Sequence, residues 1–223
     1  EWAVLARDPS SMRVTLADAR ACLQRKAGAS TRDGDEHYDA TSALIKSVRG
    51  SDPDASIYWL ARMLEAGEEV RFLCRRLLIL ASEDIGNADP QALIVAQSAA
   101  YACEFVGLPE CQFALAQVVI YLACAPKSNS ATKAIGDARR DVREGRVVPV
   151  PQHLRDSHST SARLRGHGAN YVSPHDLDSG VAAQEYLGVD RTYYVPVDRG
   201  FESELAERLR RIREVMRSGA EME

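Results

Sequence analysis

The chain has 223 residues, of which 45% are hydrophobic and 27% are charged, and its formal net charge is −4. This size supports one substantial hydrophobic core with a smaller additional piece. Because the chain has no overall excess of positive charge, any affinity for nucleic acid must come from a local patch. Only 6% of the residues are aromatic, and alanine and leucine dominate several stretches. Such side chains lose little rotamer freedom in a helix, so the composition predicts an all-α protein.

The five cysteines lie in apolar surroundings and form no C-x-x-C pair: Cys22, Cys74, Cys103, Cys111 and Cys124. Free cysteine behaves as a small hydrophobic residue, so we expect reduced core residues and a cytoplasmic protein. The start of the chain, from Glu1 to Val4, lacks the basic and apolar regions of a signal peptide. It indicates a piece of a longer protein.

The first predicted helix runs from Leu16 to Ala27, with the hydroxyl of Thr15 as its N-cap. The following stretch, GASTRDGDE, is rich in glycine, serine and aspartate and has no apolar periodicity. It predicts a linker over residues 28–37 and a domain boundary there.

Three helices are predicted after the linker, at about 38–49, 53–66 and from Val70 to just before Gly86. Gly50 and Gly67 follow the ends of the first two, and Asp52 followed by Pro53 is typical of a helix start. The short connections indicate antiparallel neighbours in a bundle.

Residues 90–125 form a predicted helical hairpin that is apolar nearly all round. Between Gln91 and Ala125 the only charged residues are Glu104 and Glu110, whereas a helix on a monomer's surface needs a polar face. Each apolar run is too short to cross a membrane. The hairpin is either buried wholly inside its own bundle or partly in contact with another subunit. For the second case the candidate interface residues are Leu93, Ala96, Ala100, Phe105, Phe113, Val118 and Tyr121.

The last third of the chain alternates between helical and irregular patterns. A helix is predicted from Ser128 or Asn129 to Glu144, and Pro149 and Pro151 follow it. Residues 157–200 predict a long loop-rich excursion, either pinned to the bundle by tyrosines or used for contact. Those tyrosines are Tyr171, Tyr186, Tyr193 and Tyr194. Finally, a C-terminal amphipathic helix is expected from the spacing of Phe201, Leu205, Leu209, Ile212 and Met216.

We find no sequence pattern for a self-sufficient catalytic, cofactor or metal site. The chain lacks both G-x-x-x-x-G-K-[ST] and G-x-G-x-x-G, the glycine-rich loops that cradle phosphates. His158, His167 and His175 have no neighbouring cysteine and no H-E-x-x-H spacing that would support a zinc site. No serine or cysteine stands in a nucleophile-elbow pattern. We therefore expect the chain itself not to be an enzyme.

Arginines gather in two places. The candidate nucleic-acid patch consists of Arg139, Arg140, Arg143 and Arg146, with Arg163 and Arg165 as further members. On the last helix, five arginines alternate with Glu204, Glu207 and Glu214, which is typical of intrahelical ion pairs.

Several long sequence segments resemble those of one protein family. They are HYDATSALIKSVRGSDPDASIYWLARMLEAGEE, RRLLILASEDIGNADPQAL, YLACAPKSNSATKAI and VPVPQHLRDSH, followed by SPHD, AQEYL and YYVPVDRGFE. In collinear order over residues 13–215 they are similar to the C-terminal region of the replication-associated recombination protein A (MgsA-type) family of AAA+ ATPases. Werner-helicase-interacting protein is the eukaryotic relative.

The resemblance implies a helical oligomerisation domain, similar to the clamp-loader collar, that builds a homotetramer. Residues 1–27 would be the remnant of the AAA+ lid, residues 38–217 the oligomerisation domain and residues 218–223 a tail. In the family the whole protein uses ATP and Mg²⁺, acts on DNA at replication forks and cooperates with single-stranded-DNA-binding protein. No ATPase residue maps to this chain, so no cofactor is expected in it.

Two functional hypotheses follow. The leading one is a tetramerisation domain that assembles the subunits of a AAA+ ATPase acting in replication-fork maintenance, recombination and repair. The alternative is a docking module that binds single-stranded DNA or the single-stranded-DNA-binding protein through the arginine patch or the loop excursion.

Overall fold

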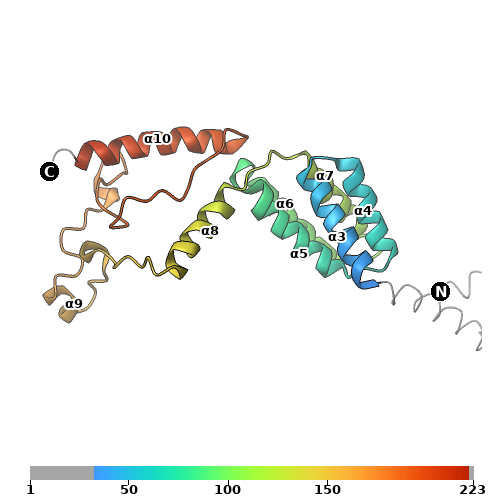
Figure 1. The fold of residues 1–223 in the computed structure, drawn as a ribbon, viewed down its shortest axis with the longest axis horizontal. Coiled ribbons are helices and arrows are strands. Elements are labelled where there is room, and N and C mark those ends of the chain that lie inside the picture. Colours follow the sequence, from blue (N-terminus) through green and yellow to red (C-terminus); the bar gives the residue numbers. More distant parts are fainter. Residues whose placement is uncertain (1–32, 221–223) are drawn as a thin grey trace, which may run out of the picture. The chain divides into compact units, whose positions relative to one another are not determined.

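The computed structural model describes residues 33–220, and they contain helices and irregular segments but no strand (Figure 1). The all-α prediction is therefore confirmed. The predicted helix at 16–27, the first part of the linker and the end of the tail lie outside the described residues. Within them the chain forms two compact units, and the oligomerisation domain over 38–217 stays a prediction. The first unit comprises residues 33–80 and 95–124, and the second comprises residues 81–94 and 125–220.

The first unit is a bundle whose helices closely follow the predicted spans. Its members are α3 (Asp33–Arg49), α4 (Pro53–Glu65), α5 (Val70–Leu80), most of α6 (Gln91–Val106) and α7 (Gln112–Cys124). The side chain of Asp52 accepts a hydrogen bond of 2.9 Å from the amide of Ala55, as its N-cap role predicts. Gly67 has a φ of +80°, and the amides of Gly67 and Glu68 bond back to the last turn of α4. This is a Schellman ending, and it turns the chain toward α5.

Helix α7 lies at the centre of the first unit and packs against α3, α4 and α5. Its side chains Leu115, Val119 and Leu122 have no exposed surface. The core facing them includes Leu44 and Val48 of α3, Leu60 and Met63 of α4, and Leu73 and Leu77 of α5. Full burial of one such side chain contributes roughly 1.5–3 kcal/mol. The core of this unit is thus built from aliphatic side chains at helical spacing.

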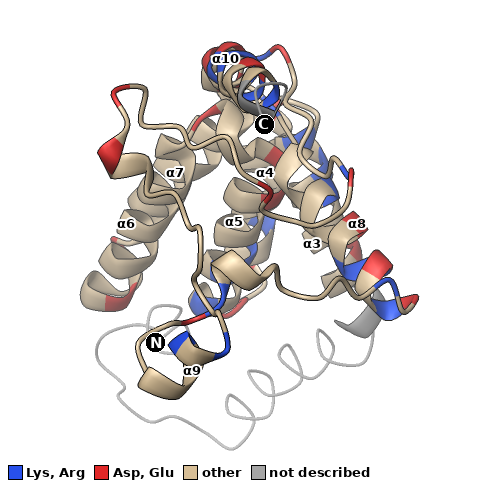
Figure 2. Cartoon of the chain, turned by 90° about the vertical axis from the view of Figure 1, so that its left-hand side faces the viewer, with Lys and Arg blue, Asp and Glu red and all other residues tan. Residues whose placement is uncertain are grey.

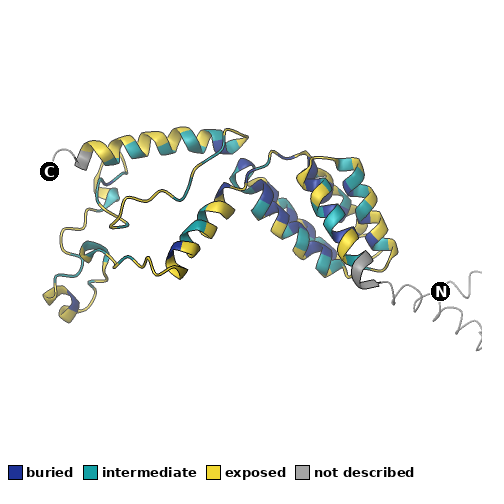
Figure 3. Cartoon of the chain, viewed as in Figure 1, coloured by how far each residue is buried: buried dark blue, intermediate teal, exposed yellow. Residues whose placement is uncertain are grey.

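The second unit combines two helices of ordinary length with several short helical turns, and long irregular segments join them. Its helical elements are η1 (Ala81–Ile85, a π-helix), η2 (Gly86–Ala88), α8 (Ser130–Arg143), η3 (Gln152–Leu154), α9 (Thr160–Leu164), η4 (Pro174–Asp176) and α10 (Phe201–Ala220). Figure 3 shows mainly exposed and half-buried residues from α8 onward. The predicted helices near 129–144 and 201–216 are confirmed as α8 and α10.

The start of α10 is held against η2. Gly200 has a φ of +55°, and a Cβ atom there would lie 2.2 Å from the carbonyl oxygen of Ala88, so only glycine fits. The next buried group is Glu202, whose carboxylate accepts a hydrogen bond of 2.8 Å from the hydroxyl of Tyr194. Arg213 of α10 donates to the carbonyl oxygen of Tyr194 at 3.1 Å. Tyr194 therefore fastens the end of the irregular excursion to α10.

Candidate assembly surface and groove

Helix α6 buries only small side chains. Its buried face consists of Ala92, Ala96, Ala99 and Cys103, at spacings of a helical stripe. The opposite face is exposed and carries large aromatic side chains beside the polar Gln97 and Ser98: Tyr101 is 72% exposed and Phe105 is 81% exposed. Their rings are stacked with centroids 6.3 Å apart. The helix therefore presents a preformed aromatic pair on the outside of the first unit.

Further apolar side chains continue this exposure into the next turn and helix. We define the α6–α7 surface as Tyr101, Phe105, Val106, Leu108, Phe113 and Ile120, all exposed and all in the first unit. Figure 2 shows α6 and α7 almost free of charged residues. The charged exception, Glu104, forms an ion pair with Arg71 of α5. Large exposed apolar surfaces are rare on monomers and mark interaction sites.

The structure separates the seven predicted interface residues into three groups. Leu93, Phe105 and Phe113 are exposed, and Ala100 and Tyr121 are half-buried. The prediction is wrong for Ala96 and Val118. They are 3% and 1% exposed, so they lie in the core, where no partner can reach them. Sequence reasoning missed Tyr101 and Leu108. The spacing of four residues between Tyr101 and Phe105 was the available signal.

Three cysteines of the first unit are buried and offer no reactive thiol. Cys74, Cys103 and Cys111 are buried, and the pKa of each thiol is raised, chiefly by burial, to about 11 for Cys103. A thiol with such a pKa is a poor nucleophile at neutral pH. Cys124 is exposed, which corrects the expectation of a core residue, and Cys22 lies outside the described residues.

The predicted arginine patch is partly neutralised. Arg140 pairs with Asp137 at 2.6 Å, and Arg146 pairs with both Asp141 and Glu144. Arg139 and Arg143 are exposed and form no ion pair within residues 33–220. Of the four guanidinium groups in the patch, the two that form no ion pair both lie on α8.

Opposite charges interleave along α10, as the sequence predicted (Figure 2). Hydrogen bonds from Arg210 and Arg211 lower the pKa of Glu207 to about 2, and Arg210 also reaches Glu214 at 2.6 Å. These are intrahelical ion pairs, which leave α10 without a continuous basic track.

A buried carboxylate organises the second unit. Asp141 of α8 is 3% exposed and accepts hydrogen bonds from Arg146 at 2.8 Å, from Arg191 at 3.3 Å and from the hydroxyl of Tyr193 at 3.1 Å. The Nε atom of Arg191 also forms an ion pair with this carboxylate at 3.0 Å. Burial alone would raise the pKa of Asp141, but Tyr193 and the two guanidinium groups outweigh it and the pKa lies below its usual value. The carboxylate is thus held ionised. It ties the segment around Arg191 to α8, about 50 residues away in sequence.

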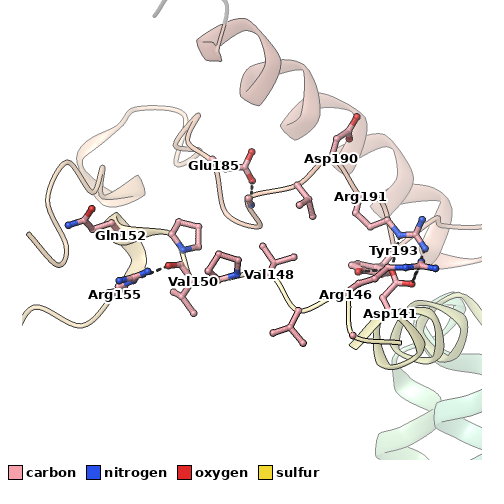
Figure 4. A pocket seen from close by; sticks show the side chains of 16 residues that line it. Asp141, Arg146, Val148, Val150, Gln152, Arg155, Glu185, Asp190, Arg191 and Tyr193 are labelled. Atoms are coloured by element: carbon pink, nitrogen blue, oxygen red, sulfur yellow. Dashed lines mark hydrogen bonds and ion pairs between the residues drawn. The ribbon is translucent and has the colours of Figure 1, made fainter. Parts of the chain in front are cut away.

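Beside this carboxylate lies a groove of about 700 Å³ (Figure 4). Residues 145–152 and 185–193 form its two walls, and Arg155 lies at one end. We call it the valine groove, because Val147, Val148, Val150 and Val189 line it together with Pro149 and Pro151. Sequence reasoning did not find it, since its walls are far apart in the chain.

Two classes of site have no counterpart in the part of the chain that the structure describes. No group of three His, Cys, Asp or Glu side chains is arranged to hold a metal ion. No helix there is both long and apolar enough to span a bilayer.

Two family models match the chain. The model of the MgsA AAA+ ATPase C-terminal region matches residues 50–213, and the model of the AAA C-terminal domain matches residues 1–49. The boundary between them falls at the end of α3.

Curated relatives agree with this match. An uncharacterized AAA domain-containing protein of Mycobacterium tuberculosis is 52% identical over 83% of this chain and 42% of its own length. The replication-associated recombination protein A of Bacillus subtilis is 44% identical over 92% of this chain and 50% of its own length. ATPase WRNIP1 of Dictyostelium discoideum is 44% identical over 70% of this chain and 18% of its own length. The chain spans half or less of the length of these relatives, and it belongs to the MgsA family of AAA+ ATPases, corresponding to the C-terminal region of that family.

Proposed function

We propose that this chain is the assembly domain of a AAA+ ATPase that acts in replication-fork maintenance, recombination and repair, and that it joins four copies into a homotetramer. The ATPase activity, with its ATP and Mg²⁺, would belong to the remainder of the protein. The chain itself would bind other copies and catalyse nothing.

The observation that carries the proposal is the α6–α7 surface. Tyr101, Phe105 and Phe113 are each more than two-thirds exposed in the single chain, at 72%, 81% and 69%. Aromatic side chains are enriched at the buried centres of interfaces, where they dominate the binding energy. The α6–α7 surface of a second copy is a suitable partner, because it is equally apolar and equally poor in charged residues.

Helix α6 is suited to present this surface because its large aromatic side chains, Tyr101 and Phe105, are exposed. Its inward side chains, Ala96, Ala99 and Cys103, are small and buried. The large side chains are then left for contact outside. An amphipathic surface helix has the reverse arrangement, with large apolar residues inside and polar residues outside.

Assembly is tested by sedimentation equilibrium at micromolar concentration. We expect a tetramer for the unmodified chain, and a stable monomer there would overturn the proposal. Tyr101→Glu buries a charge in the proposed interface, so it should shift the population to smaller species. Tyr58→Glu is the matched control, because Tyr58 of α4 is 61% exposed in the same unit but lies outside the α6–α7 surface. Circular dichroism of both variants establishes that their helices are intact.

A further inference from the structure

Helix α8 exposes apolar side chains and buries polar ones. We define the α8 stripe as the apolar residues that lie four, three and four positions apart along one side of the helix: Ala131, Ile135, Ala138 and Val142. Ile135 is 59% exposed and Val142 is 61% exposed. The buried residues of the helix are instead Ser130 and Asp141. Because a surface helix normally buries its apolar stripe, α8 has an apolar side that remains largely uncovered within residues 33–220.

Polar contacts at both ends fix the rotation of α8 about its axis. In its first turn, the hydroxyl of Thr132 donates to the carbonyl oxygen of Glu83 at 3.2 Å. In its last turn, the buried carboxylate of Asp141 contacts Arg191 and Tyr193. The helix cannot roll to bury its stripe without breaking these contacts. The stripe is therefore presented in a preformed orientation, which lowers the cost of binding a partner.

One flank of the α8 stripe carries positive charge that is not neutralised. Residues on a helix are about 100° apart, so Arg139 and Arg143 lie together beside the stripe. Both are exposed, and their side chains form no ion pair or hydrogen bond within residues 33–220. Arg140 falls on the opposite side of the helix, where it pairs with Asp137 at 2.6 Å. The stripe is thus bordered by two guanidinium groups that are available to a partner.

From this arrangement we infer that α8 binds an amphipathic helix of a partner protein, in which carboxylates flank the apolar stripe. The apolar side chains of the partner pack over the small Ala138, between Ile135 and Val142. Spacings of four and three residues are those at which two packed helices interdigitate. The carboxylates of the partner lie near Arg139 and Arg143, where charge-assisted hydrogen bonds to guanidinium are strong.

Other occupants match the α8 stripe less well. A second α8 packed antiparallel would bring the flanking arginines of both copies to the same side, where like charges repel. A nucleic acid would use Arg139 and Arg143 but not Ile135, and α8 has no aromatic side chain on which a base could stack. A bilayer surface favours large apolar side chains, whereas two of the four stripe residues are alanine. Apolar and cationic groups together favour the acidic helix.

The inference is tested by fluorescence anisotropy with the full chain and a labelled peptide of three heptads, with leucine at positions a and d and glutamate at e and g. Repulsion between the glutamates opposes pairing of the peptide with itself at neutral pH. We expect saturable binding that is lost when lysines replace the glutamates. The double variant Arg139→Glu and Arg143→Glu should bind the glutamate peptide about tenfold more weakly, and it should gain affinity for the lysine peptide.

Arg140→Glu is the matched control, because it makes the same substitution on the opposite side of the same helix. Equal weakening by Arg140→Glu would overturn the inference. The apolar half of the contact is tested by Ile135→Ser, which should also weaken binding. Val195→Ser should not, because Val195 is 65% exposed in the same unit but lies outside α8.

A second measurement uses the unmodified protein and so does not depend on how a variant folds. In methyl-labelled protein, the glutamate peptide should shift the NMR signals of Ile135 and Val142. Shifts confined to other residues would contradict the inference.

The remaining outcomes assign α8 to a different occupant. If Ile135→Ser reduces the oligomer in sedimentation and leaves peptide binding unchanged, the stripe belongs to an interface between copies and the inference is wrong. It is also wrong if an oligothymidylate displaces the peptide and its own binding is insensitive to Ile135→Ser. Tyr101→Glu, which tests the assembly proposal, should leave peptide binding unchanged, so the two proposals can fail independently.

Discussion

The first unit and the segment from 145 to 193 in the second unit achieve order in different ways. In the first unit α7 buries Leu115, Val118 and Leu122 among three other helices. The segment instead places most of its valines at the surface and is tied down by polar contacts, above all those of Asp141. Apolar burial is non-directional and shared among many neighbours. A polar contact depends on single donor and acceptor atoms. The order of this segment should therefore be sensitive to single substitutions and to pH, whereas that of the helical bundle should not.

The largest effect is expected from a core substitution in the first unit. Leu122→Ala leaves a cavity in a side-chain environment with no solvent exposure, and it should lower the free energy of unfolding by about 2–5 kcal/mol. Ile120→Ala, two residues away on the exposed side of α7, is the control and should cost far less. Urea denaturation followed by circular dichroism measures both. Equal losses for the two variants would contradict the central position assigned to α7.

A smaller effect is expected at the start of α10. Gly200→Ala places a methyl group 2.2 Å from the carbonyl oxygen of Ala88 at a positive φ, so the backbone must shift at a cost of about 1–3 kcal/mol. Gly180→Ala isolates the conformational part of this cost, because Gly180 also has a positive φ of +65° but nothing lies near its Cβ position. Thermal unfolding should show a clear further loss for Gly200→Ala. Equal melting temperatures would mean that α10 does not depend on the contact with η2.

The smallest effect on global stability, and the most local one, is expected for Asp141→Asn. The amide cannot hold two guanidinium groups and a phenol as the carboxylate does, so residues 185–193 should exchange their amide hydrogens faster while the first unit is unchanged. Because the pKa of Asp141 is lowered in the folded state, its stabilising contribution is present at neutral pH. That contribution is lost as the pH falls through the aspartate range near about 4 and below. Hydrogen exchange of the variant and the unmodified chain should therefore converge in acid, and a difference that persists there would contradict this role.

Much of the fold was predictable because helix boundaries carry local signals. Asp52, Pro53 and Gly67 mark the limits of α4 in the sequence and perform those roles in the structure. The start of α3 was missed by five residues, because 33–37 has no apolar periodicity. There the helix is supported by contacts from elsewhere in the chain: His37 lies on the ring of Phe72 with centroids 5.0 Å apart and reaches Glu68.

The candidate sites were predictable only in part. The sequence predicted an apolar hairpin. It could not distinguish the buried from the exposed positions of α6 and α7, because both helices are nearly continuous apolar runs. Ala96 and Val118 were misplaced for this reason. The valine groove had no local signal at all, because Asp141 meets Arg191 and Tyr193 only after a connection of about 50 residues.

The contacts of Asp141 with Arg191 and Tyr193 fix both ends of the connecting segment. The part of the chain between these ends should therefore tolerate changes in length. Both walls of the groove are secured at 141–155 and 185–193, while Asp178, Ser179 and Gly180 between them are exposed. Loop-closure entropy rises by only about 0.6 kcal/mol for each doubling of length. The tip near Ser179 is therefore a suitable place to insert an epitope tag or a fluorophore-labelling sequence, which would report on the groove without altering its walls or the bundle.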